Sequence, residues 1–321
     1  MTKGRPPGRP HAGPWEARLE RKKASDFPPA LLDLLHDYVH GDIGRRVFLQ
    51  GAQKFAVGGV TAAALFDMLA PNFAWANQVP EDDKRIKSET VSIASPQGNG
   101  KIDAYLVRPA EARGKLPGIM VFHENRGLNP YIKDVTRRFA LEGYLALAPD
   151  GLTSVGGDPP GVVDPTEDVK GAALFKSVDP DKMMQDFFAA SAWLQARADG
   201  TGKIGATGFC FGGGVANQLA VHMGAGLSAA VPYYGTAPKT EDVARIKAPI
   251  NAQYGETDTR ITAGWAAYDA ALTAAGVAHE GHIYKGAAHG FFNDTTPRYS
   301  ADASKEAWGH TLDWFGKYVK A

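Results

Sequence analysis

The sequence has little cysteine, no net charge and no long apolar run, and each shortage excludes a class of protein. Cys210 is the single cysteine among 321 residues, so neither a disulfide within the chain nor a site built from several cysteines is possible. Lysine and arginine number 35, as do aspartate and glutamate, and the formal net charge is zero. Because a neutral chain lacks the field that attracts nucleic acid or an anionic membrane, we set nucleic-acid binding aside.

The remaining composition indicates a folded protein. Hydrophobic residues make up 44% of the chain, which suffices for a full core and excludes global disorder. The length allows one α/β domain of ordinary size together with an extension. We expect the N-terminal extension to cover residues 1–80 and the catalytic domain to cover residues 81–321, because the character of the chain changes between them.

The extension begins with a segment that does not favour regular structure. Residues 1–28 are rich in Pro, Gly, Arg and Lys and lack apolar periodicity, which predicts a disordered tail. In residues 29–40, four leucines and a tyrosine fall on one side of a helical wheel. This spacing predicts a short amphipathic helix.

The middle of the extension resembles an export signal. Segment 44–50 reads G-R-R-V-F-L-Q, and a twin arginine followed by x-Phe-Leu resembles the consensus of a twin-arginine signal. A moderately apolar stretch follows over residues 55–69, too short to span a bilayer stably. Ala74-Trp75-Ala76 then has the small-x-small pattern of a cleavage site. The order of these features predicts export to the periplasm through the twin-arginine machinery.

A helix packed on the catalytic domain is the alternative interpretation of the same residues. Asp67 lies within the apolar stretch, and more than forty residues precede the paired arginines, both of which are unusual for a signal. In this alternative the protein is cytoplasmic and keeps its N-terminal helix. The sequence leaves open whether residues 1–76 are removed, and it leaves the oligomeric state open as well.

From residue 88 onward, strand and helix patterns alternate. This alternation predicts a mostly parallel sheet with helices on both faces. The Gly98-Asn99-Gly100 turn predicts an opening hairpin. We expect a long loop, of the length often used in function, over residues 150–170. The expected strands cover residues 91–93, 102–107, 116–122, 144–148, 203–208, 229–234, 250–254 and 280–284, and the expected helices cover 131–142, 180–198, 211–222, 263–275 and 301–319.

The only cysteine lies in a motif typical of a nucleophile. Residues 208–212 read G-F-C-F-G at the junction between a predicted strand and a predicted helix, the cysteine form of the G-x-S-x-G elbow. The two glycines leave room for close backbone packing around a strained turn. The first N–H groups of the helix and its dipole favour a thiolate and later an oxyanion. A buried structural cysteine is the alternative, because free cysteine packs as a small hydrophobe.

The acid and the base follow in the order that an α/β-hydrolase requires. Asp258 lies in the loop after the strand that ends at Tyr254, where a carboxylate can orient a histidine. Glu256 competes with Asp258 for this role. His289 lies in a glycine-flanked loop before the last helix, where the base is required. In this arrangement His289 takes the thiol proton, Asp258 fixes the imidazole tautomer, and the sulfur attacks a carbonyl.

The other histidines are interpreted as structural or surface residues. The sequence contains no H-E-x-x-H motif, and we expect neither a metal site nor a cofactor. Cysteine is a good nucleophile and a good leaving group, which favours activated esters and lactones over amides. The remaining histidines are His11, His36, His40, His222, His279, His282 and His310.

Taken together, residues 88–320 resemble the dienelactone hydrolase family, also called the carboxymethylenebutenolidases. The resemblance rests on the 208–213 elbow, on the loops of Asp258 and His289-Gly290-Phe291, on H-E-N-R-G-L over residues 123–128, and on Ala148-Pro149-Asp150. The chain is most similar to the branch with an N-terminal R-R-x-F-L segment. The resemblance implies the α/β-hydrolase fold and hydrolysis of a small ester or lactone.

The resemblance also implies roles for residues near the nucleophile. Glu124 is implied to contact the resting thiol and, when substrate binds, to help to ionise the sulfur. A salt bridge from Glu124 to Arg126 or Arg298 is the alternative, because carboxylate–arginine pairs are common whatever the function. The backbone N–H groups of Asn125 and Phe211 are the candidate oxyanion hole.

One feature departs from the family. Its type members hold the substrate carboxylate with an arginine shortly after A-P-D, whereas here Gly151 to Gly156 contain none. Arg126, Arg260 and Arg298 are the candidates to supply this charge.

Two further functions use the same fold. The first is a broader thioesterase or acyltransferase with the same triad, which product analysis with alcohol acceptors would separate from a hydrolase. The second is a non-catalytic protein that binds a small molecule, since fold alone does not fix function. The simultaneous presence of the elbow, the acid and the histidine argues against the binding protein.

Overall fold

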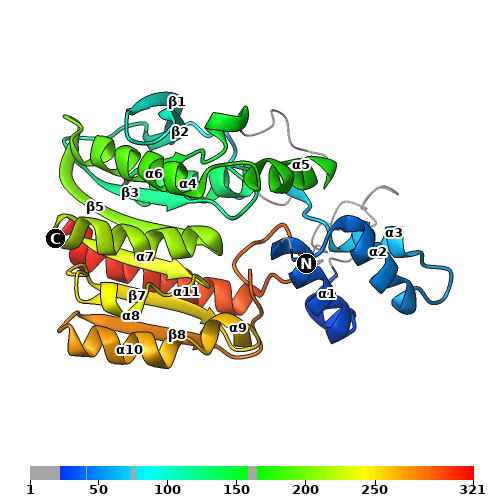
Figure 1. Cartoon of the computed structure of the whole chain (residues 1–321). Helices are drawn as coiled ribbons and strands as arrows, with labels where there is room; N and C mark the ends of the chain where they lie inside the picture. The colour runs from blue at the N-terminus through cyan, green and yellow to red at the C-terminus, as the bar shows by residue number, and fades with distance from the viewer. Residues whose placement is uncertain (1–21, 41, 74–76, 158–164) are drawn as a thin grey trace, which may run out of the picture.

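A computed structural model describes residues 22–40, 42–73, 77–157 and 165–321. They form an eight-stranded sheet in the order β1-β2-β4-β3-β5-β6-β7-β8 (Figure 1). The β1–β2 and β2–β4 pairs are antiparallel and the other pairs are parallel. This confirms the predicted hairpin and the α/β-hydrolase architecture. The strands are β1 (Ile86–Ser95), β2 (Gly100–Pro109), β3 (Leu116–Phe122), β4 (Leu145–Pro149), β5 (Gly200–Phe209), β6 (Ala229–Tyr233), β7 (Ile250–Gly255) and β8 (His279–Tyr284).

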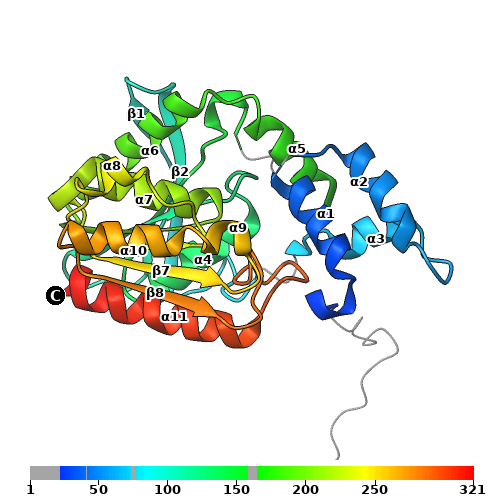
Figure 2. The same cartoon turned by 60° about the horizontal axis from the view of Figure 1, so that its bottom comes forward.

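Helices cover both faces of this sheet and bury a separate core on each (Figures 1 and 2). Strand β3 shows why its apolar run is continuous: Ile119 and Val121 belong to one core, Met120 and Phe122 to the other. One core contains residues of α4 (Pro130–Leu141) and α11 (Ala301–Phe315), and the other contains residues of α6 (Pro180–Gln195), α7 (Phe211–Met223) and α10 (Trp265–Ala274).

Three details differ from the sequence predictions. Loop 150–170 contains a 3₁₀ turn, Thr153–Val155, and the start of helix α5 (Pro165–Phe175). The helix predicted over residues 263–275 begins at Trp265 as α10 (Trp265–Ala274), and a separate short helix, α9 (Thr259–Thr262), precedes it. The last helix ends its α-helical part at Phe315 and continues as a π-helical turn, Gly316–Lys320. The remaining short helix, α8, covers Thr240–Val243.

Residues 27–40 and 42–73 form a small helical unit whose helices bury a core of their own. It contains α1 (Pro29–His40), α2 (Arg45–Ala52) and α3 (Ala62–Leu69), of which α1 confirms the predicted amphipathic helix. In Figure 2 the arrowheads of β7 and β8 point toward this unit, so it lies beyond the carboxyl ends of these strands. Its buried side chains are Phe27, Leu31, Leu35, Phe48, Ala52, Leu65, Phe66 and Leu69.

The expected disordered tail is wrong over its last residues. Ala24–Asp26 form a 3₁₀ turn, and Phe27 is buried in the core of the helical unit. Residues 1–21 and the A-x-A segment at 74–76 lie outside the described residues. No helix in the described ranges is long and apolar enough to cross a membrane.

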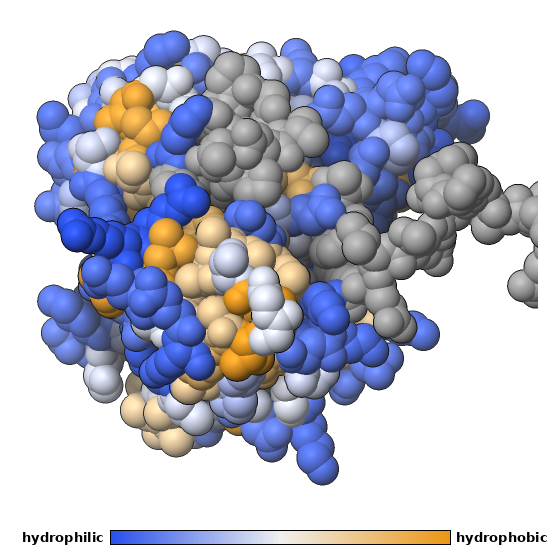
Figure 3. Space-filling model, turned by 90° about the vertical axis from the view of Figure 1, so that its right-hand side faces the viewer, coloured by the Kyte–Doolittle hydropathy of each residue, from blue (hydrophilic) through white to orange (hydrophobic). Residues whose placement is uncertain are grey.

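The export-signal residues have structural roles in the helical unit. Phe48 of the R-R-x-F-L segment is fully buried in its core, and the Arg45 guanidinium lies 4.9 Å from the centre of the Phe66 ring. Apolar side chains also gather on the face of the molecule that looks away from the sheet (Figure 3). The exposed large apolar residues of the unit are Val47, Val57 and Met68. Export by the twin-arginine route stays a prediction.

Candidate active site

Cys210 lies between β5 and α7 in a backbone conformation that side chains rarely adopt. Its φ is 55° and its ψ is −114°, and its N–H donates a hydrogen bond to the Tyr233 carbonyl at 3.1 Å. A positive φ at a non-glycine residue stores strain that the surrounding fold must hold in place. The predicted strand-to-helix elbow is present, and it brings the nearly buried Cys210 to the carboxyl end of the sheet.

The glycines of the elbow are required by close backbone contacts. A Cβ on Gly208 would stand 2.1 Å from the Gly212 carbonyl oxygen. A Cβ on Gly212 would stand 2.3 Å from the Phe122 carbonyl oxygen at the end of β3. Because these neighbours are backbone atoms, they have no freedom to move aside. The G-x-C-x-G spacing thus packs the elbow directly against the neighbouring strand.

Asp258 and His289 form a buried pair beside this elbow. The distance between His289 Nδ1 and Asp258 Oδ2 is 2.6 Å, and their side chains are 5% and 2% exposed. Asp258 follows β7 and His289 follows β8, so the parallel register of these strands brings the two loops together. Glu256 has a different role: its exposed carboxylate accepts a hydrogen bond from the Gly286 N–H at 2.8 Å.

The surroundings of His289 favour its protonated form. Burial alone would lower its pKa, but the charge of Cys210, hydrogen bonds to Asp258 and Cys210, and the charge of Asp258 together raise the pKa to about 9. The ring is also confined: the centre of the Tyr234 ring lies 5.0 Å away and that of the His36 ring 5.5 Å away. An imidazolium next to the sulfur is the partner that stabilises a thiolate.

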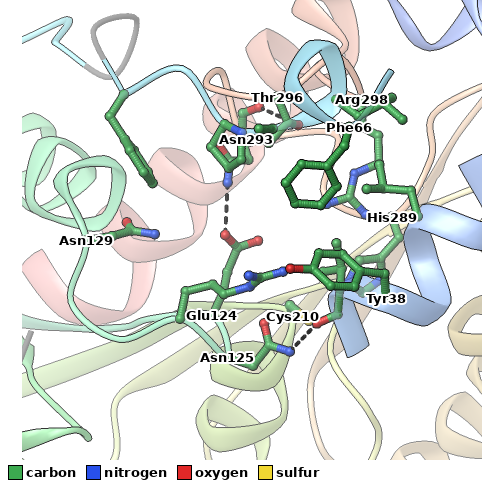
Figure 4. Close-up of a pocket in the computed structure, with 17 residues that line it drawn as sticks. Tyr38, Phe66, Glu124, Asn125, Asn129, Cys210, His289, Asn293, Thr296 and Arg298 are labelled. Atoms are coloured by element: carbon green, nitrogen blue, oxygen red, sulfur yellow. Dashed lines mark hydrogen bonds between the residues drawn. The ribbon is translucent and has the colours of Figure 1, made fainter. Parts of the chain in front are cut away.

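Glu124 lies in the same pocket as Cys210 and is nearly buried. Its Oε2 accepts a hydrogen bond of 2.9 Å from Asn293 Nδ2 (Figure 4). Asn293 is itself oriented, because its Oδ1 accepts hydrogen bonds from the N–H and Oγ1 of Thr295. Asn293 was not found from the sequence, where no motif marks it. It fixes the direction of the Glu124 carboxylate.

His123 holds the loop that carries Glu124 and Asn125. The Gly151 N–H donates to His123 Nε2 at 2.9 Å, so the ring proton lies on Nδ1, which contacts the Glu124 carbonyl oxygen. Burial is the largest influence on the pKa of His123 and lowers it. A neutral His123 therefore connects this loop with the loop after β4.

One oxyanion-hole candidate, Phe211, directly follows Cys210, and the other, Asn125, lies in the loop after β3. Phe211 is the first residue of α7, and the first N–H groups of a helix have no partner within it. Asn125 lines the pocket, and its side-chain Nδ2 donates to the Val39 carbonyl oxygen at 2.7 Å. The side chain of Asn125 therefore contacts the helical unit.

The three candidate arginines separate into two groups. Arg126 and Arg298 line the pocket, whereas Arg260 is absent from the lining in the described chain and lies 3.6 Å from Asp42. Within the described residues, the Nε and Nη1 atoms of Arg298 are buried and have no hydrogen-bond partner. Its guanidinium carbon would be 3.4 Å from a Cβ placed on Gly290, so it lies against the His289 loop. Arg298 is thus a half-buried cation that lines the pocket of Cys210, with two of its nitrogens unpaired among the described residues.

The helical unit supplies much of the pocket wall, which the sequence analysis did not predict. In Figure 4 the rings of Tyr38 and Phe66 face the space beside Cys210, opposite Glu124. This space is about 680 Å³ when its part open to solvent is included. The wall residues from this part of the chain are Leu35, Tyr38, Val39, Phe66, Leu69, Ala70, Pro71 and Phe73.

His36, one of the histidines interpreted as structural or surface residues, is half-buried, and its ring contacts that of His289. Along α1 it is four residues from His40, a spacing also seen in metal sites. Among the described residues, however, no group of three His, Cys, Asp or Glu side chains lies close enough together to hold a metal ion.

Comparison with known proteins divides the chain in the same way. The sequence model of the dienelactone hydrolase family matches residues 102–319, and a second model, described as YqhI-like, matches residues 19–57. An Escherichia coli protein described as a candidate hydrolase fragment, YghX, is 54% identical over 121 residues, which cover 38% of this chain and 98% of that protein.

Two further relatives cover most of the chain. A candidate carboxymethylenebutenolidase of Salmonella typhimurium is 34% identical over 247 residues, 74% of this chain and 89% of that protein. The crystal structure of a candidate dienelactone hydrolase from Klebsiella pneumoniae is 31% identical with a TM-score of 0.61. The match covers 72% of this chain and 100% of that one. The helical unit therefore lies outside the family match, which begins at residue 102.

Proposed function

The chain belongs to the dienelactone hydrolase family, and from this premise we propose that it cleaves a small carboxylic ester or lactone through a thioester on Cys210. As a member of this family it is a carboxylic-ester hydrolase. One observation carries the mechanism: the strained, nearly buried Cys210 shares a pocket with His289, whose ring is hydrogen-bonded to buried Asp258.

In this proposal the first half of the reaction acylates the enzyme. The thiolate of Cys210 attacks the carbonyl carbon, a C–S bond forms, and the carbonyl π electrons move to oxygen. The N–H groups of Asn125 and Phe211 receive the oxyanion. When the oxyanion collapses, the C–O bond to the leaving group breaks, and protonated His289 gives its proton to the departing alkoxide.

The second half releases the acid. Neutral His289 takes a proton from a water molecule, the water oxygen attacks the thioester carbonyl, and the C–S bond breaks. The products are a carboxylic acid and Cys210 with its proton shared with His289 again. Asp258 fixes the tautomer of His289 in both halves, since it accepts the Nδ1 proton and leaves Nε2 to face the reaction.

Glu124 assists ionisation of the thiol in this proposal. Its carboxylate lines the same pocket as Cys210 and is oriented by Asn293, so a substrate that enters between them changes its surroundings directly. A nearby carboxylate opposes a negative charge on the sulfur, so a Glu124 that moves away when its contacts change favours transfer of the thiol proton to His289. This supports the role that the family resemblance implies for Glu124.

Arg298 gives the substrate class. Arg298 lines the pocket and has two buried nitrogens with no hydrogen-bond partner among the described residues, and its positive charge suits a substrate carboxylate. We assign the substrate's anionic group to Arg298 and secondary charge compensation to Arg126. Arg260, which pairs with Asp42, is not assigned to substrate.

The test is hydrolysis of p-nitrophenyl acetate and of a dienelactone by the full chain and by Cys210→Ala. Loss of the rate by about a thousandfold in the variant is expected for removal of a triad nucleophile. Equal rates in both proteins on every ester would contradict the proposal and favour a binding protein. Adding alcohol acceptors separates a hydrolase, which gives the acid, from an acyltransferase, which gives a new ester.

A further inference from the structure

The helical unit is joined to the catalytic domain at the loops that carry the site. The Asn125 side chain donates to the Val39 carbonyl, and the Asn72 N–H donates to the Thr295 carbonyl at 2.8 Å. Asn125 follows Glu124 in the chain. Thr295 donates a hydrogen bond to the side-chain amide of Asn293, which orients Glu124. The unit is therefore attached to the two segments that position one catalytic carboxylate.

Two further contacts of the helical unit reach His289 and the helix that follows Asp258. The His36 ring meets the His289 ring edge-on, at 5.5 Å between centres and 90° between planes. Asp42 lies 3.6 Å from Arg260, which belongs to helix α9 directly after Asp258. The exposed ion pair contributes little on its own. With the contacts above, the unit therefore touches the segments that carry or follow Glu124, Asp258 and His289.

The two halves of the pocket differ in chemistry. The catalytic domain supplies polar and charged groups, among them Glu124, Asn293 and Arg298. The helical unit supplies Leu, Val, Phe, Tyr, Ala and Pro side chains. A substrate that fills this space meets hydrogen-bonding groups at one end and apolar surface at the other.

We propose that the helical unit, residues 27–40 and 42–73, forms a wall of the substrate pocket that selects esters with an apolar group next to an anionic one. Arg298 receives the anionic group, and the surface around Tyr38, Phe66 and Ala70 receives the apolar group. This assignment deepens the proposed ester hydrolysis and rests on it. It also means that the unit is part of the working enzyme, because cleavage after residue 76 would remove this entire wall.

The core of the unit supports this role. Phe48 is fully buried there, and Tyr38 packs against the rings of Phe48 and Phe66 with centres 5.5 and 5.4 Å away. A fixed core holds the inner side of Tyr38 in place and leaves its other side to the pocket. The separate sequence match over residues 19–57 shows that this segment has relatives of its own.

The single cysteine allows a test that does not depend on turnover. Every thiol-alkylation rate of this protein reports Cys210, because the sequence contains no other cysteine. Iodoacetamide probes the sulfur with a small group and N-phenylmaleimide with a bulky apolar one. Ala70→Phe narrows the pocket, and Ala63→Phe places the same ring on an exposed position of α3 as the matched control.

Ala70→Phe is expected to slow alkylation of Cys210 by N-phenylmaleimide about tenfold or more, while the rate with iodoacetamide changes little. The added ring fills part of the pocket and excludes the larger reagent. Ala63→Phe is expected to match the wild type with both reagents. Tyr38→Ala is expected to accelerate the bulky reagent, and Tyr38→Phe to restore the wild-type ratio. Circular dichroism of each full-length variant establishes that the helices are present.

Turnover is then measured on p-nitrophenyl acetate and p-nitrophenyl hexanoate. The wall predicts that Ala70→Phe raises KM for the hexanoate more than for the acetate. If Ala70→Phe and Ala63→Phe react alike with both reagents, and Tyr38→Ala does not alter the ratio, the wall is refuted. If the reagents discriminate as expected while no ester is hydrolysed, the wall stands and the proposed function fails.

Discussion

Two histidines, one from each region of the molecule, meet at the pocket, and their pKa values move in opposite directions. His289 of the catalytic domain has Cys210 and Asp258 beside it, which raise its pKa to about 9 against the effect of burial. For His36 of the helical unit, burial first and then His289, Arg260 and Arg298 lower the pKa to about 4, while Asp258 opposes this. At neutral pH one ring is charged and the other neutral.

The comparison separates the residues that would carry out the reaction from the residues that would select the substrate. The catalytic edge is fixed by backbone contacts that leave no space for a Cβ, and by the buried Asp258–His289 pair at the ends of the adjacent strands β7 and β8. The helical unit meets that edge through ring contacts, an exposed ion pair and two hydrogen bonds. Changes at the catalytic edge should therefore abolish the reaction, and changes in the unit should alter which molecules react.

The largest effect is expected at the nucleophile. Cys210→Ala should lower kcat/KM for p-nitrophenyl acetate by about a thousandfold or more, because the residual rate then comes from the pocket alone. Steady-state kinetics of the purified variant measure this. Iodoacetamide-treated wild type is the control, and its rate should fall to the same level. Substantial turnover in both samples would contradict a cysteine nucleophile.

The elbow itself is expected to be nearly as sensitive. Gly212→Ala places a Cβ 2.3 Å from the Phe122 carbonyl oxygen, so the backbone must shift, and we expect the free energy of unfolding to fall by about 3 kcal/mol. Gly309→Ala in α11 is the matched control, because nothing lies within 4 Å of its Cβ. There we expect a gain of about 0.5–1 kcal/mol from helix propensity. Urea unfolding gives both values, and equal effects would contradict the packing argument.

The raised pKa of His289 predicts a pH dependence. Imidazolium is required to protonate the leaving group, so kcat/KM should be maintained at neutral pH and should fall as the pH rises through about 9. The same sign applies to stability: a raised histidine pKa stabilises the folded state at low pH, and this contribution disappears above about 9.

Asp258→Asn sharpens this test because it removes two of the interactions that raise the pKa. In this variant the fall in kcat/KM should occur at lower pH. The maximal kcat/KM should also be lower, because the tautomer of His289 is no longer fixed. Glu256→Gln, which alters an exposed carboxylate of the same loop, should not change the pH at which kcat/KM falls. If kcat/KM of Asp258→Asn still falls near pH 9, His289 is not the group that titrates.

Arg298 gives a smaller and more selective effect. Arg298→Met should raise KM for an ester bearing a carboxylate by about ten- to a hundredfold, because a charge-assisted interaction with the carboxylate is lost. KM for p-nitrophenyl acetate should change little. Arg260→Met is the control for loss of one positive charge near the site. A uniform effect of Arg298→Met on both esters would contradict its assignment to the anionic group.

The smallest effect concerns the attachment of the helical unit. Because the pKa of His36 is lowered, the attached state is favoured fully above about 6.5 and loses this advantage as the pH falls toward about 4, where a detached His36 would be protonated. Limited proteolysis of the unit should therefore accelerate a few-fold between pH 7 and pH 5, a range in which one histidine changes charge. His36→Gln should weaken this dependence, and an unchanged dependence would assign it to another group.

A site residue could be predicted from the sequence when its role depends on neighbouring residues in the chain. Cys210, Asp258 and His289 follow from spacing within single loops, and the structure brings them together as expected. Asn293 and the wall around Tyr38 were missed, because their roles arise only when segments far apart in the chain meet. The apolar periodicity of residues 29–40 predicts that α1 buries one face, but it does not say against which surface.

The same distinction explains the interpretation of the helical unit. Small apolar residues after a basic pair are compatible with a signal and with a packed helix, since both need the same composition. The burial of Phe48 and the ring contact of His36 depend on tertiary structure, which composition does not encode. Local rules therefore predicted the catalytic edge better than the wall that faces it.

Intact-mass spectrometry after rapid acid quench tests the central claim most directly. The full chain is mixed with an excess of p-nitrophenyl hexanoate and quenched before a full turnover, and peptide mapping locates any added mass. Our account predicts one hexanoyl group on the peptide that contains Cys210, absent from Cys210→Ala and removed by hydroxylamine. Release of p-nitrophenol without an acyl group on Cys210, or with the group on another residue, would contradict it.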